Sequence, residues 1–297
     1  MPQGATKGGE RMRFLVLGGD ARSAHLYKLM LGEGLDVGLA GFSDLPESAK
    51  DLAEAVRNSD IIIGPIPFSN GQELNMPFSA ASMSLAELFQ SVREEAAIMG
   101  GRLNRDALRL AKERGVLALD LLEREEMAML NAIPTAEGAI QTAMENTPFT
   151  LHQSKILVTG FGRISKVLSK MLLGLGAYVS VAARKPGDLA LAEALGCQPV
   201  NIKSLEDLKA ALGKADIIIN TIPSVVIDAQ LTRLIRKETL VIELASKPFG
   251  IDVQACRNQG ANVIFAPSLP GKVAPLTAAR YILLTVKNIL RELECIG

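Results

Sequence analysis

The residues of this chain whose spacing most clearly predicts chemistry are two glycines in its second half, Gly160 and Gly162. In a strand-to-helix turn, the first glycine permits the sharp bend, and the second lets backbone N–H groups approach a pyrophosphate at the positive end of the helix. The third position of the pattern, where glycine or alanine allows close helix–strand packing, is Ser165, a departure from it. We predict a dinucleotide-phosphate turn, and the alternative is a tight turn without a ligand. The expected contacts are Gly160, Gly162, Arg163 and Ile164.

Two basic residues indicate which dinucleotide binds. An NAD site places a carboxylate about twenty residues beyond the glycines, where it accepts a hydrogen bond from the ribose 2′-OH. Counting from Gly162 reaches Ala182 and Ala183 without a carboxylate, and then Arg184 and Lys185. Because cations suit a 2′-phosphate, we predict NADP rather than NAD. The alternative is that both are ordinary solvated residues at the end of a strand.

The elements that position these residues form one β-α-β unit between residues 155 and 185. A strand over 156–159 precedes the glycine turn, and a second strand runs from Tyr178 to Ala183. The helix between them buries one face, because its apolar residues recur three and four apart. These apolar residues are Ile164, Val167, Leu168, Met171, Leu172 and Leu175.

Two later strands, predicted over 216–221 and 240–244, end in segments that suit the nicotinamide side of a cofactor. The carboxyl ends of parallel strands meet at one edge of the sheet, where ligands bind in open α/β folds. The residues expected there are Asn220, Thr221, Pro223, Ala245 and Ser246.

The first half of the chain contains candidate substrate-binding residues. A strand over 14–17 is followed by Gly18-Gly19-Asp20-Ala21-Arg22 and a helix. Asp20 either caps that helix or lies with Arg22 at the ligand-binding edge of a second sheet. The loop 67–77 is long and rich in Pro, Ser and Asn, which is typical of a functional loop, and we expect Ser69 and Asn70 to contact substrate there.

The catalytic candidates are Thr135, Glu137 and Asn220. Residues 131–138 are predicted to open a helix that runs to about Glu145, after a separate short helix over 123–130. In the alternative interpretation Thr135 only caps that helix and Glu137 only favours its first turn. His152 precedes a strand at the opposite end of the sheet and is expected to be structural.

The composition excludes several classes of protein. The 297 residues contain 32 basic and 32 acidic side chains, so no charge imbalance favours binding to nucleic acid or to an anionic membrane. Aromatic residues make up 4% and Trp is absent, which argues against base-stacking surfaces. The three cysteines are scattered and suit neither a metal site nor a disulfide framework. No signal-peptide or membrane-spanning pattern is found, which predicts a cytoplasmic protein.

The expected fold is α/β, with two Rossmann-like, doubly wound parallel-sheet domains and a ligand crevice between them. The last helix has one apolar side and is expected to return to the first domain. The predicted segments are a disordered N-terminus (1–12), a flavodoxin- or Rossmann-like substrate domain with a connecting helix (13–151), an NADP-binding domain (152–268) and the C-terminal helix (269–297).

Taken together, these segments resemble the A-subunit family of dipicolinate synthase over nearly the whole chain. Four motifs carry the resemblance: residues 18–22 (GGDAR), 133–138 (IPTAEG), 220–224 (NTIPS) and 269–275 (LPGKVAP). The family's nucleotide turn usually reads G-x-G-R-x-G, which Arg163 matches and Ser165 does not. Lys272 replaces a residue that is usually aliphatic, so no family role is assigned to it.

The resemblance implies an NADP-dependent oxidation of dihydrodipicolinate, derived from 4-hydroxy-tetrahydrodipicolinate, to dipicolinate during sporulation. It also implies a flavoprotein-like partner, the B subunit of dipicolinate synthase, a small dicarboxylate substrate, a homo-oligomer, and a location in the mother cell. The family provides no agreed catalytic residue to carry over.

Other dehydrogenase classes fit the residues less well. A D-2-hydroxyacid dehydrogenase needs a histidine acid–base late in the chain, and the only histidines are His25 and His152. A shikimate-type enzyme shares the Asn-Thr-x-Pro pattern but needs a Lys–Asp pair that is not present in the first half. Two alternatives stay open: another NADP-dependent oxidoreductase of a small dicarboxylate, and a non-catalytic NADP-binding regulatory subunit.

Overall fold

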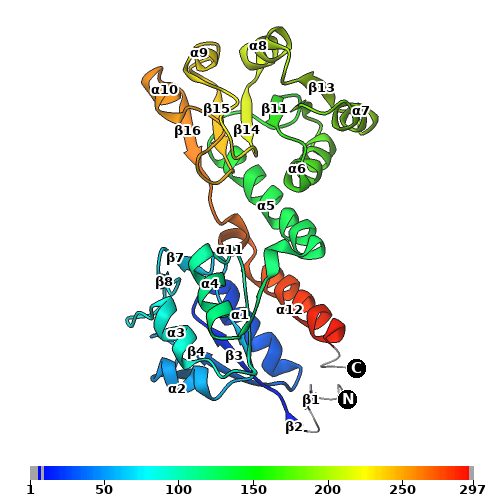
Figure 1. The fold of residues 1–297 in the computed structure, drawn as a ribbon. Helices are drawn as coiled ribbons and strands as arrows, with labels where there is room; N and C mark the ends of the chain where they lie inside the picture. The colour runs from blue at the N-terminus through cyan, green and yellow to red at the C-terminus, as the bar shows by residue number, and fades with distance from the viewer. Residues whose placement is uncertain (1–5, 8–9, 294–297) are drawn as a thin grey trace. The chain divides into compact units, whose positions relative to one another are not determined.

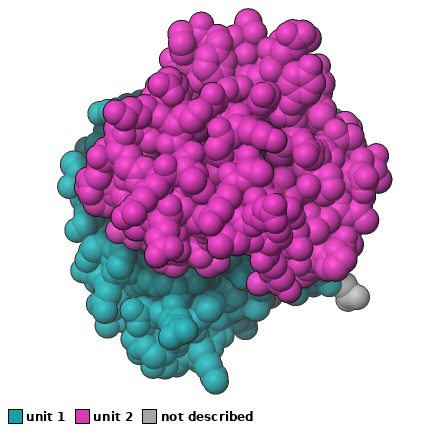
Figure 2. All heavy atoms as spheres, turned by 90° about the horizontal axis from the view of Figure 1, so that it is seen from above, with its two compact units in different colours: residues 1–130, 274–297 teal, residues 131–273 magenta. Residues whose placement is uncertain are grey.

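The computed structural model describes residues 6–7 and 10–293, and it divides the chain into two compact units. Unit 1 comprises residues 1–130 and 274–297, and unit 2 comprises residues 131–273; Figure 2 colours them separately. Each unit is a parallel β-sheet with helices on both faces, so the predicted two-domain α/β fold is confirmed.

Unit 1 contains six parallel strands in the Rossmann order 3-2-1-4-5-6, which places the first strand beside the fourth. From one edge to the other, the strands are β5 (Ser48–Ala49), β4 (Asp36–Ala40), β3 (Arg13–Leu17), β6 (Ile61–Ile63), β9 (Ala97–Gly100) and β10 (Leu117–Asp120). Its other elements are α1 (Ala21–Gly32), α2 (Leu52–Arg57), α3 (Leu85–Ser91), α4 (Arg105–Glu113), the 3-10 helix η1 (Leu121–Glu123), α12 (Pro275–Glu292) and two short hairpins, β1 (Thr6–Lys7) with β2 (Glu10–Arg11) and β7 (Ser69–Asn70) with β8 (Glu73–Leu74).

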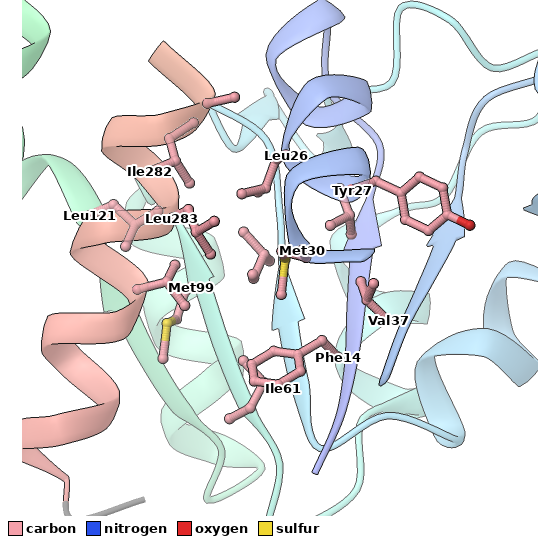
Figure 3. Packing of buried hydrophobic residues seen from close by; sticks show 14 of the residues in the cluster. Phe14, Leu26, Tyr27, Met30, Val37, Ile61, Met99, Leu121, Ile282 and Leu283 are labelled. Atoms are coloured by element: carbon pink, nitrogen blue, oxygen red, sulfur yellow. The ribbon is translucent and has the colours of Figure 1, made fainter. Parts of the chain in front are cut away.

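The two faces of the unit 1 sheet bury alternate residues of each strand, as the two-residue period of a strand requires. On one face, Phe14 and Val16 pack with α1 and α12, through side chains such as Met30 and Leu283 (Figure 3). The helix α12 lies beside α1, although about 250 residues separate them in sequence (Figure 1). The C-terminal helix therefore returns to the first unit, as expected from its apolar side.

Unit 2 repeats the same strand order. The strands are β13 (Gln198–Asn201), β12 (Tyr178–Ala183), β11 (Lys155–Thr159), β14 (Ile217–Asn220), β15 (Leu240–Glu243) and β16 (Asn262–Phe265). The helices are α6 (Arg163–Gly174), α7 (Pro186–Ala194), α8 (Leu205–Lys214), α9 (Ala229–Thr232), α10 (Val253–Asn258) and α11 (Leu269–Val273), with most of α5 (Glu125–Glu145). The predicted β-α-β unit corresponds to β11, α6 and β12.

The helix α5 corrects one prediction. It is continuous over Glu125–Glu145, where two helices were expected, and Pro134 lies inside it. A proline in a helix interior costs about 3 kcal/mol locally. A stripe of buried alanines runs along the helix past the proline, and its packing outweighs that cost. These alanines are Ala132, Ala136, Ala139 and Ala143.

Two end segments also differ from expectation. Of the predicted disordered N-terminus, residues 1–5 and 8–9 lie outside the described residues, but Thr6–Lys7 pairs with Glu10–Arg11, so disorder is wrong for these four. Residues 269–273, expected as part of a rigid turn, form the short helix α11.

Candidate nucleotide and substrate sites

The glycine turn of unit 2 has the geometry that a phosphate group requires. Gly160 adopts φ 93°, and a Cβ there would lie 2.6 Å from Thr221 Oγ1, so only glycine fits. Gly162 is the N-cap residue of α6, and a Cβ there would meet nothing within 4 Å. No side chain caps this helix, so its first N–H groups are not satisfied by a capping side chain. These features suit a pyrophosphate at the positive end of the helix.

The surroundings of Ser165 show why a serine can replace the glycine or alanine of the usual pattern. Its side chain is fully buried, and its hydroxyl lies 2.8 Å from Thr221 Oγ1. Thr221 Oγ1 in turn donates to the backbone oxygen of Thr159 at 2.8 Å. The small polar residue therefore packs against the neighbouring strand end with its hydroxyl paired, and close helix–strand approach is preserved.

Arg184 and Lys185 lie where the cofactor prediction requires them. Both follow directly after β12, and both are exposed. Lys185 is the N-cap residue of α7, which also has no side-chain cap. Neither side chain forms an ion pair with any residue that the structure describes, so both cations can meet a ligand phosphate.

Asn220 does not lie at the surface of this site. Its side chain is fully buried, and its amide oxygen accepts from Thr159 Oγ1 at 2.6 Å and from the N–H of Ile222 at 3.1 Å. Its amide nitrogen donates to Glu243 Oε1 at 2.6 Å and to the Ile222 carbonyl at 3.0 Å. Because every polar atom is engaged, the predicted direct contact of Asn220 with substrate or cofactor is corrected to a structural one. Thr221 is half-buried and Pro223 is exposed.

Sequence reasoning missed Glu243, the last residue of β15. It is 2% exposed and accepts from Asn220 and from the backbone N–H groups of Ala245 and Gly250. Burial raises the pKa of this carboxyl, while the hydrogen bonds that it accepts lower it by a smaller amount. A carboxylate at the end of an otherwise apolar strand was the signal available in the sequence. Ala245 and Ser246, predicted to contact cofactor, follow it at the same edge of the sheet.

The other two catalytic candidates lie on α5. Thr135 is buried and donates to the Asn131 carbonyl at 2.7 Å, so it does not cap a helix. Glu137 is exposed and lines a groove of about 610 Å³ whose other lining side chains include Met171 and Leu175, at the end of α6 away from the glycine turn. The structure therefore groups Glu137 with a largely apolar surface.

The predicted substrate residues of unit 1 share one edge of its sheet. Asp20 caps α1 and also holds Arg22 through two hydrogen bonds of 2.9 Å, to Nε and to Nη2. Arg22 is 5% exposed, and its Nη2 also donates to the Ile66 carbonyl. One edge of the guanidinium is thus already occupied by a carboxylate of the protein.

Asn75 connects the two parts of this edge. Its carbonyl accepts from the N–H of Gly19, and its side-chain oxygen accepts from Asn70 Nδ2 at 3.1 Å. Ser69 Oγ accepts from Asn104 Nδ2 at 2.9 Å. The structure therefore brings Asp20, Arg22, Ser69 and Asn70 to the carboxyl edge of the unit 1 sheet, with Asn75 and Asn104 as partners that the sequence did not indicate.

Neither a metal-binding cluster nor a membrane-spanning helix is found in the part of the chain that the structure describes. No cluster of His, Cys, Asp and Glu side chains there could hold a metal ion. None of the described helices combines the length and hydropathy needed to cross a membrane.

Comparison with known proteins decides the family. Residues 13–122 match the family described as the N-terminal domain of the dipicolinate synthase A subunit. Over 95% of its length the chain is 30% identical to the A subunit of dipicolinate synthase from Bacillus subtilis (strain 168), and the match covers 97% of that protein. The chain belongs to the A-subunit family of dipicolinate synthase. Residues 18–22 lie within the matched domain, and the match over 95% of the chain confirms the resemblance that the four motifs indicated.

Solved structures agree with this assignment. A crystal structure of the dipicolinate synthase A subunit from Bacillus halodurans superposes with a TM-score of 0.84 at 30% identity, covering 94% of this chain and 97% of that one. The corresponding crystal structure from Bacillus subtilis gives 0.85 at 29% identity, covering 98% of each chain. A transhydrogenase from Sinorhizobium meliloti gives 0.66 at 16% identity, covering 95% and 96%, which shows the dehydrogenase-like fold alone.

The second half of the chain also matches a dehydrogenase family. Residues 141–264 match the family described as shikimate / quinate 5-dehydrogenase. This match covers β11 to β15 and most of β16, the elements that carry the glycine turn. Together with the fold, it indicates an oxidoreductase-like protein with a nicotinamide nucleotide as cofactor.

Proposed function

We propose that this chain oxidises a dihydrodipicolinate, derived from 4-hydroxy-tetrahydrodipicolinate, to dipicolinate, with NADP as hydride acceptor. The observation that carries the proposal is the site at the edge of the unit 2 sheet. There, the start of α6 has no side-chain cap, Gly162 faces open space, and two exposed cations follow β12. This arrangement, in a chain of this family, favours a dinucleotide with a 2′-phosphate.

Each residue has a distinct task in this proposal. The backbone N–H groups at the start of α6 hold the pyrophosphate, and Gly162 leaves it room to approach. Arg184 and Lys185 pair with the 2′-phosphate. When bound, NADP supplies the hydride acceptor: the dihydropyridine loses one hydrogen as hydride and one as a proton, and becomes aromatic.

The chain needs to supply little acid–base chemistry for this reaction. Aromatisation drives the loss of the second hydrogen, so water or a modest base suffices as the proton acceptor. Of the predicted catalytic residues, Thr135 and Asn220 have their polar atoms engaged within the protein. Glu137 is exposed, but it lines the groove at the end of α6 away from the glycine turn, so the proposal assigns proton transfer to water.

A turnover assay tests the proposal. The purified chain is incubated with NADP and enzymatically generated 4-hydroxy-tetrahydrodipicolinate, and the ultraviolet band of the pyridine product is followed together with NADPH formation. We expect both to appear in equal amounts. NADPH formation from other dicarboxylates, but not from this precursor, would instead identify a different NADP-dependent oxidoreductase.

One observation favours a second candidate, a non-catalytic NADP-binding regulatory subunit. Two of the three predicted catalytic side chains are buried and fully bonded. Tight NADPH binding without turnover, whether this chain is alone or with its partner, would support this alternative.

The partner and setting of the reaction belong to the same proposal. The name of the related Bacillus subtilis protein describes one subunit of a synthase, which suggests that a companion chain exists. We propose that the companion is the flavoprotein-like B subunit of dipicolinate synthase, that this chain forms a homo-oligomer, and that it acts in the cytoplasm of the mother cell during sporulation. Co-purification of the two proteins, followed by light scattering, tests the assembly.

A further inference from the structure

Three adjacent strands of unit 2 end in polar residues that form a continuous ladder. Thr159, Asn220 and Glu243 close β11, β14 and β15, and they are paired in register across the sheet. All three are at most 2% exposed. Thr159 Oγ1 donates to Asn220 Oδ1 at 2.6 Å, and Asn220 Nδ2 donates to Glu243 Oε1 at 2.6 Å. The hydrogen bonds therefore run sideways, from strand to strand, below the edge where ligands bind.

The ladder also holds the two loops that leave this edge. Glu243 accepts from the N–H of Ala245 through Oε1 at 2.9 Å, and from the N–H of Gly250 through Oε2 at 3.1 Å, so it closes the loop 244–250 at both ends. Asn220 bonds both the N–H and the carbonyl of Ile222 in the other loop. A Cβ at Gly250 would lie 2.4 Å from Asn220 Nδ2 and 2.5 Å from the Ile222 oxygen, so the two loops lie in close contact.

A buried carboxylate is an unfavourable way to end a strand unless it is hydrogen-bonded. The other residues of β15 are buried and apolar, and an apolar residue would complete the strand without desolvating a charge. Glu243 instead provides two oxygens to the side chain that ends β14 and to the N–H groups at both ends of the loop 244–250. Its geometry is that of a fixed anchor for the loops rather than of a group that meets solvent or ligand.

The two anchored loops lie on one side of the expected dinucleotide site. In this strand order a dinucleotide lies across the point where the order reverses, here between β11 and β14. The adenine half would then lie over β11, β12 and β13, where Arg184 follows β12. The nicotinamide half would lie over β14 and β15, whose ends carry the loops 221–224 and 244–250.

We propose that Glu243 is a positioning residue that holds these two loops in the arrangement that receives the nicotinamide half of the cofactor. This inference rests on the proposed function in one respect, that a dinucleotide binds at the glycine turn. It assigns no direct contact between Glu243 and the cofactor.

Two probes separate this role from a general structural one. NADPH carries both halves, whereas adenosine 2′,5′-bisphosphate carries the adenine half and the 2′-phosphate but no nicotinamide. In Glu243→Gln, an amide N–H group replaces one acceptor oxygen and faces a backbone N–H donor. We expect NADPH affinity to fall by about ten- to a hundredfold and the affinity for adenosine 2′,5′-bisphosphate to change by less than about twofold.

Glu238→Gln is the matched control, because Glu238 is exposed and lies just before the opposite end of the same strand. It should leave both affinities unchanged. Unchanged NADPH affinity in Glu243→Gln would overturn the proposal, as would an equal loss for both probes. If the wild-type chain binds neither probe, the proposed function itself fails, so the two failures are distinguishable.

Hydrogen exchange on the wild-type chain keeps the proposal testable if Glu243→Gln does not fold. The amides of Ala245 and Gly250 should exchange slowly without nucleotide, because both donate to a buried carboxylate. Thr159→Val, which removes the far end of the ladder, should speed exchange at both amides. Exchange at the rate of an unstructured peptide in the wild-type chain would show that Glu243 anchors nothing.

Discussion

Among single residues, two arginines have opposite environments: Arg184 follows β12, and Arg22 follows β3. Arg184 is exposed and has no ion-pair partner among the residues that the structure describes, whereas Arg22 is buried against Asp20. An exposed arginine can form a charge-assisted hydrogen bond with a ligand without losing an existing ion pair. A buried arginine already forms an ion pair within the protein, so its substitution affects both the stability of the fold and the binding of any ligand.

Arg184→Ala should weaken NADPH binding and leave NADH binding nearly unchanged. A charge-assisted contact with the 2′-phosphate is worth about 1.5–3 kcal/mol, which corresponds to roughly ten- to a hundredfold in Kd. Fluorescence titration with both nucleotides measures the difference. Arg233→Ala, at another exposed arginine of unit 2, is the control. Equal losses for NADPH and NADH would show that Arg184 does not bind the phosphate.

Arg22→Lys should lower kcat/KM for the dicarboxylate without changing NADPH affinity. An arginine can bind a carboxylate through two parallel hydrogen bonds, but Asp20 already occupies the Nε and Nη2 edge of Arg22. Nη1 makes no hydrogen bond to any described residue and can offer one charge-assisted contact, worth about 1.5–3 kcal/mol. The expected loss is therefore about ten- to a hundredfold. If turnover stays within about threefold of wild type while the protein is folded, Arg22 is only structural.

Among the helices, two glycines have opposite surroundings. Gly162, at the start of α6, faces open space, and its φ of −81° is one that any residue adopts. Gly138, inside α5, lies against α11, and a Cβ there would come within 2.9 Å of Leu269 Cβ. The first glycine leaves room for a ligand, and the second leaves room for a neighbouring helix.

Gly162→Val should abolish nucleotide binding while both units stay folded. The valine side chain would occupy the space through which the pyrophosphate approaches, and it would clash with nothing in the protein itself. Calorimetric titration measures the loss of NADPH binding, and circular dichroism checks that the variant is folded. Gly174→Val, at the other end of α6 and also facing open space, is the control. Undiminished NADPH affinity in Gly162→Val would remove the basis of the nucleotide site.

Gly138→Ala should destabilise unit 2, although alanine is the better helix former. The added methyl group overpacks the contact between α5 and α11, at a cost of about 1–3 kcal/mol. Gly174→Ala adds the same group where nothing is near, and should stabilise by up to about 1 kcal/mol. Denaturant unfolding of both variants should therefore give changes of opposite sign. A stabilised Gly138→Ala would mean that the two helices can separate without loss.

Across the molecule, the last described helix packs on the first one within unit 1. The helix α12 packs on α1 and buries Ile282, Leu283 and Val286 in the same cluster as Phe14. Ion pairs lie at the rim of this contact. Arg124 binds Glu292 through two hydrogen bonds, of 2.6 and 2.5 Å, so the segment before α5 is tied to the end of α12.

Lowering the pH should weaken the ion pair between Arg124 and Glu292. Hydrogen bonds from Arg124 lower the pKa of Glu292 below its ordinary value of about 4.5. A carboxyl whose pKa is lowered in the folded state contributes stability above its unfolded pKa, and that stability is lost as the pH falls through the folded value. The free energy of unfolding should therefore decrease less between neutral and acid pH in Arg124→Met than in the wild type. Arg109→Met, which breaks an exposed pair within α4, is the control. An unchanged pH dependence in Arg124→Met would show that solvent screens the pair fully.

The features that depend on neighbours along the chain could be predicted from the amino-acid sequence. Apolar periodicity predicts the helix of the β-α-β unit, and the positions of the glycine turn and of Arg184 follow from short spacings. The four motifs are also short, and they were enough to indicate the family. Each of these signals is local, because backbone geometry limits which residues can occupy a tight turn or a strand end.

Which polar groups are already occupied depends on the packing of distant segments. Asn220 and Glu243 are 23 residues apart, and their pairing depends on the order and register of β14 and β15. The continuity of α5 through Pro134 depends on what its alanine stripe packs against. The contact of Arg22 Nη2 with the Ile66 carbonyl depends on the loop after β6, although the partner Asp20 is local. Burial and hydrogen bonding between distant segments set these outcomes, and they outweigh the local preferences that a sequence displays.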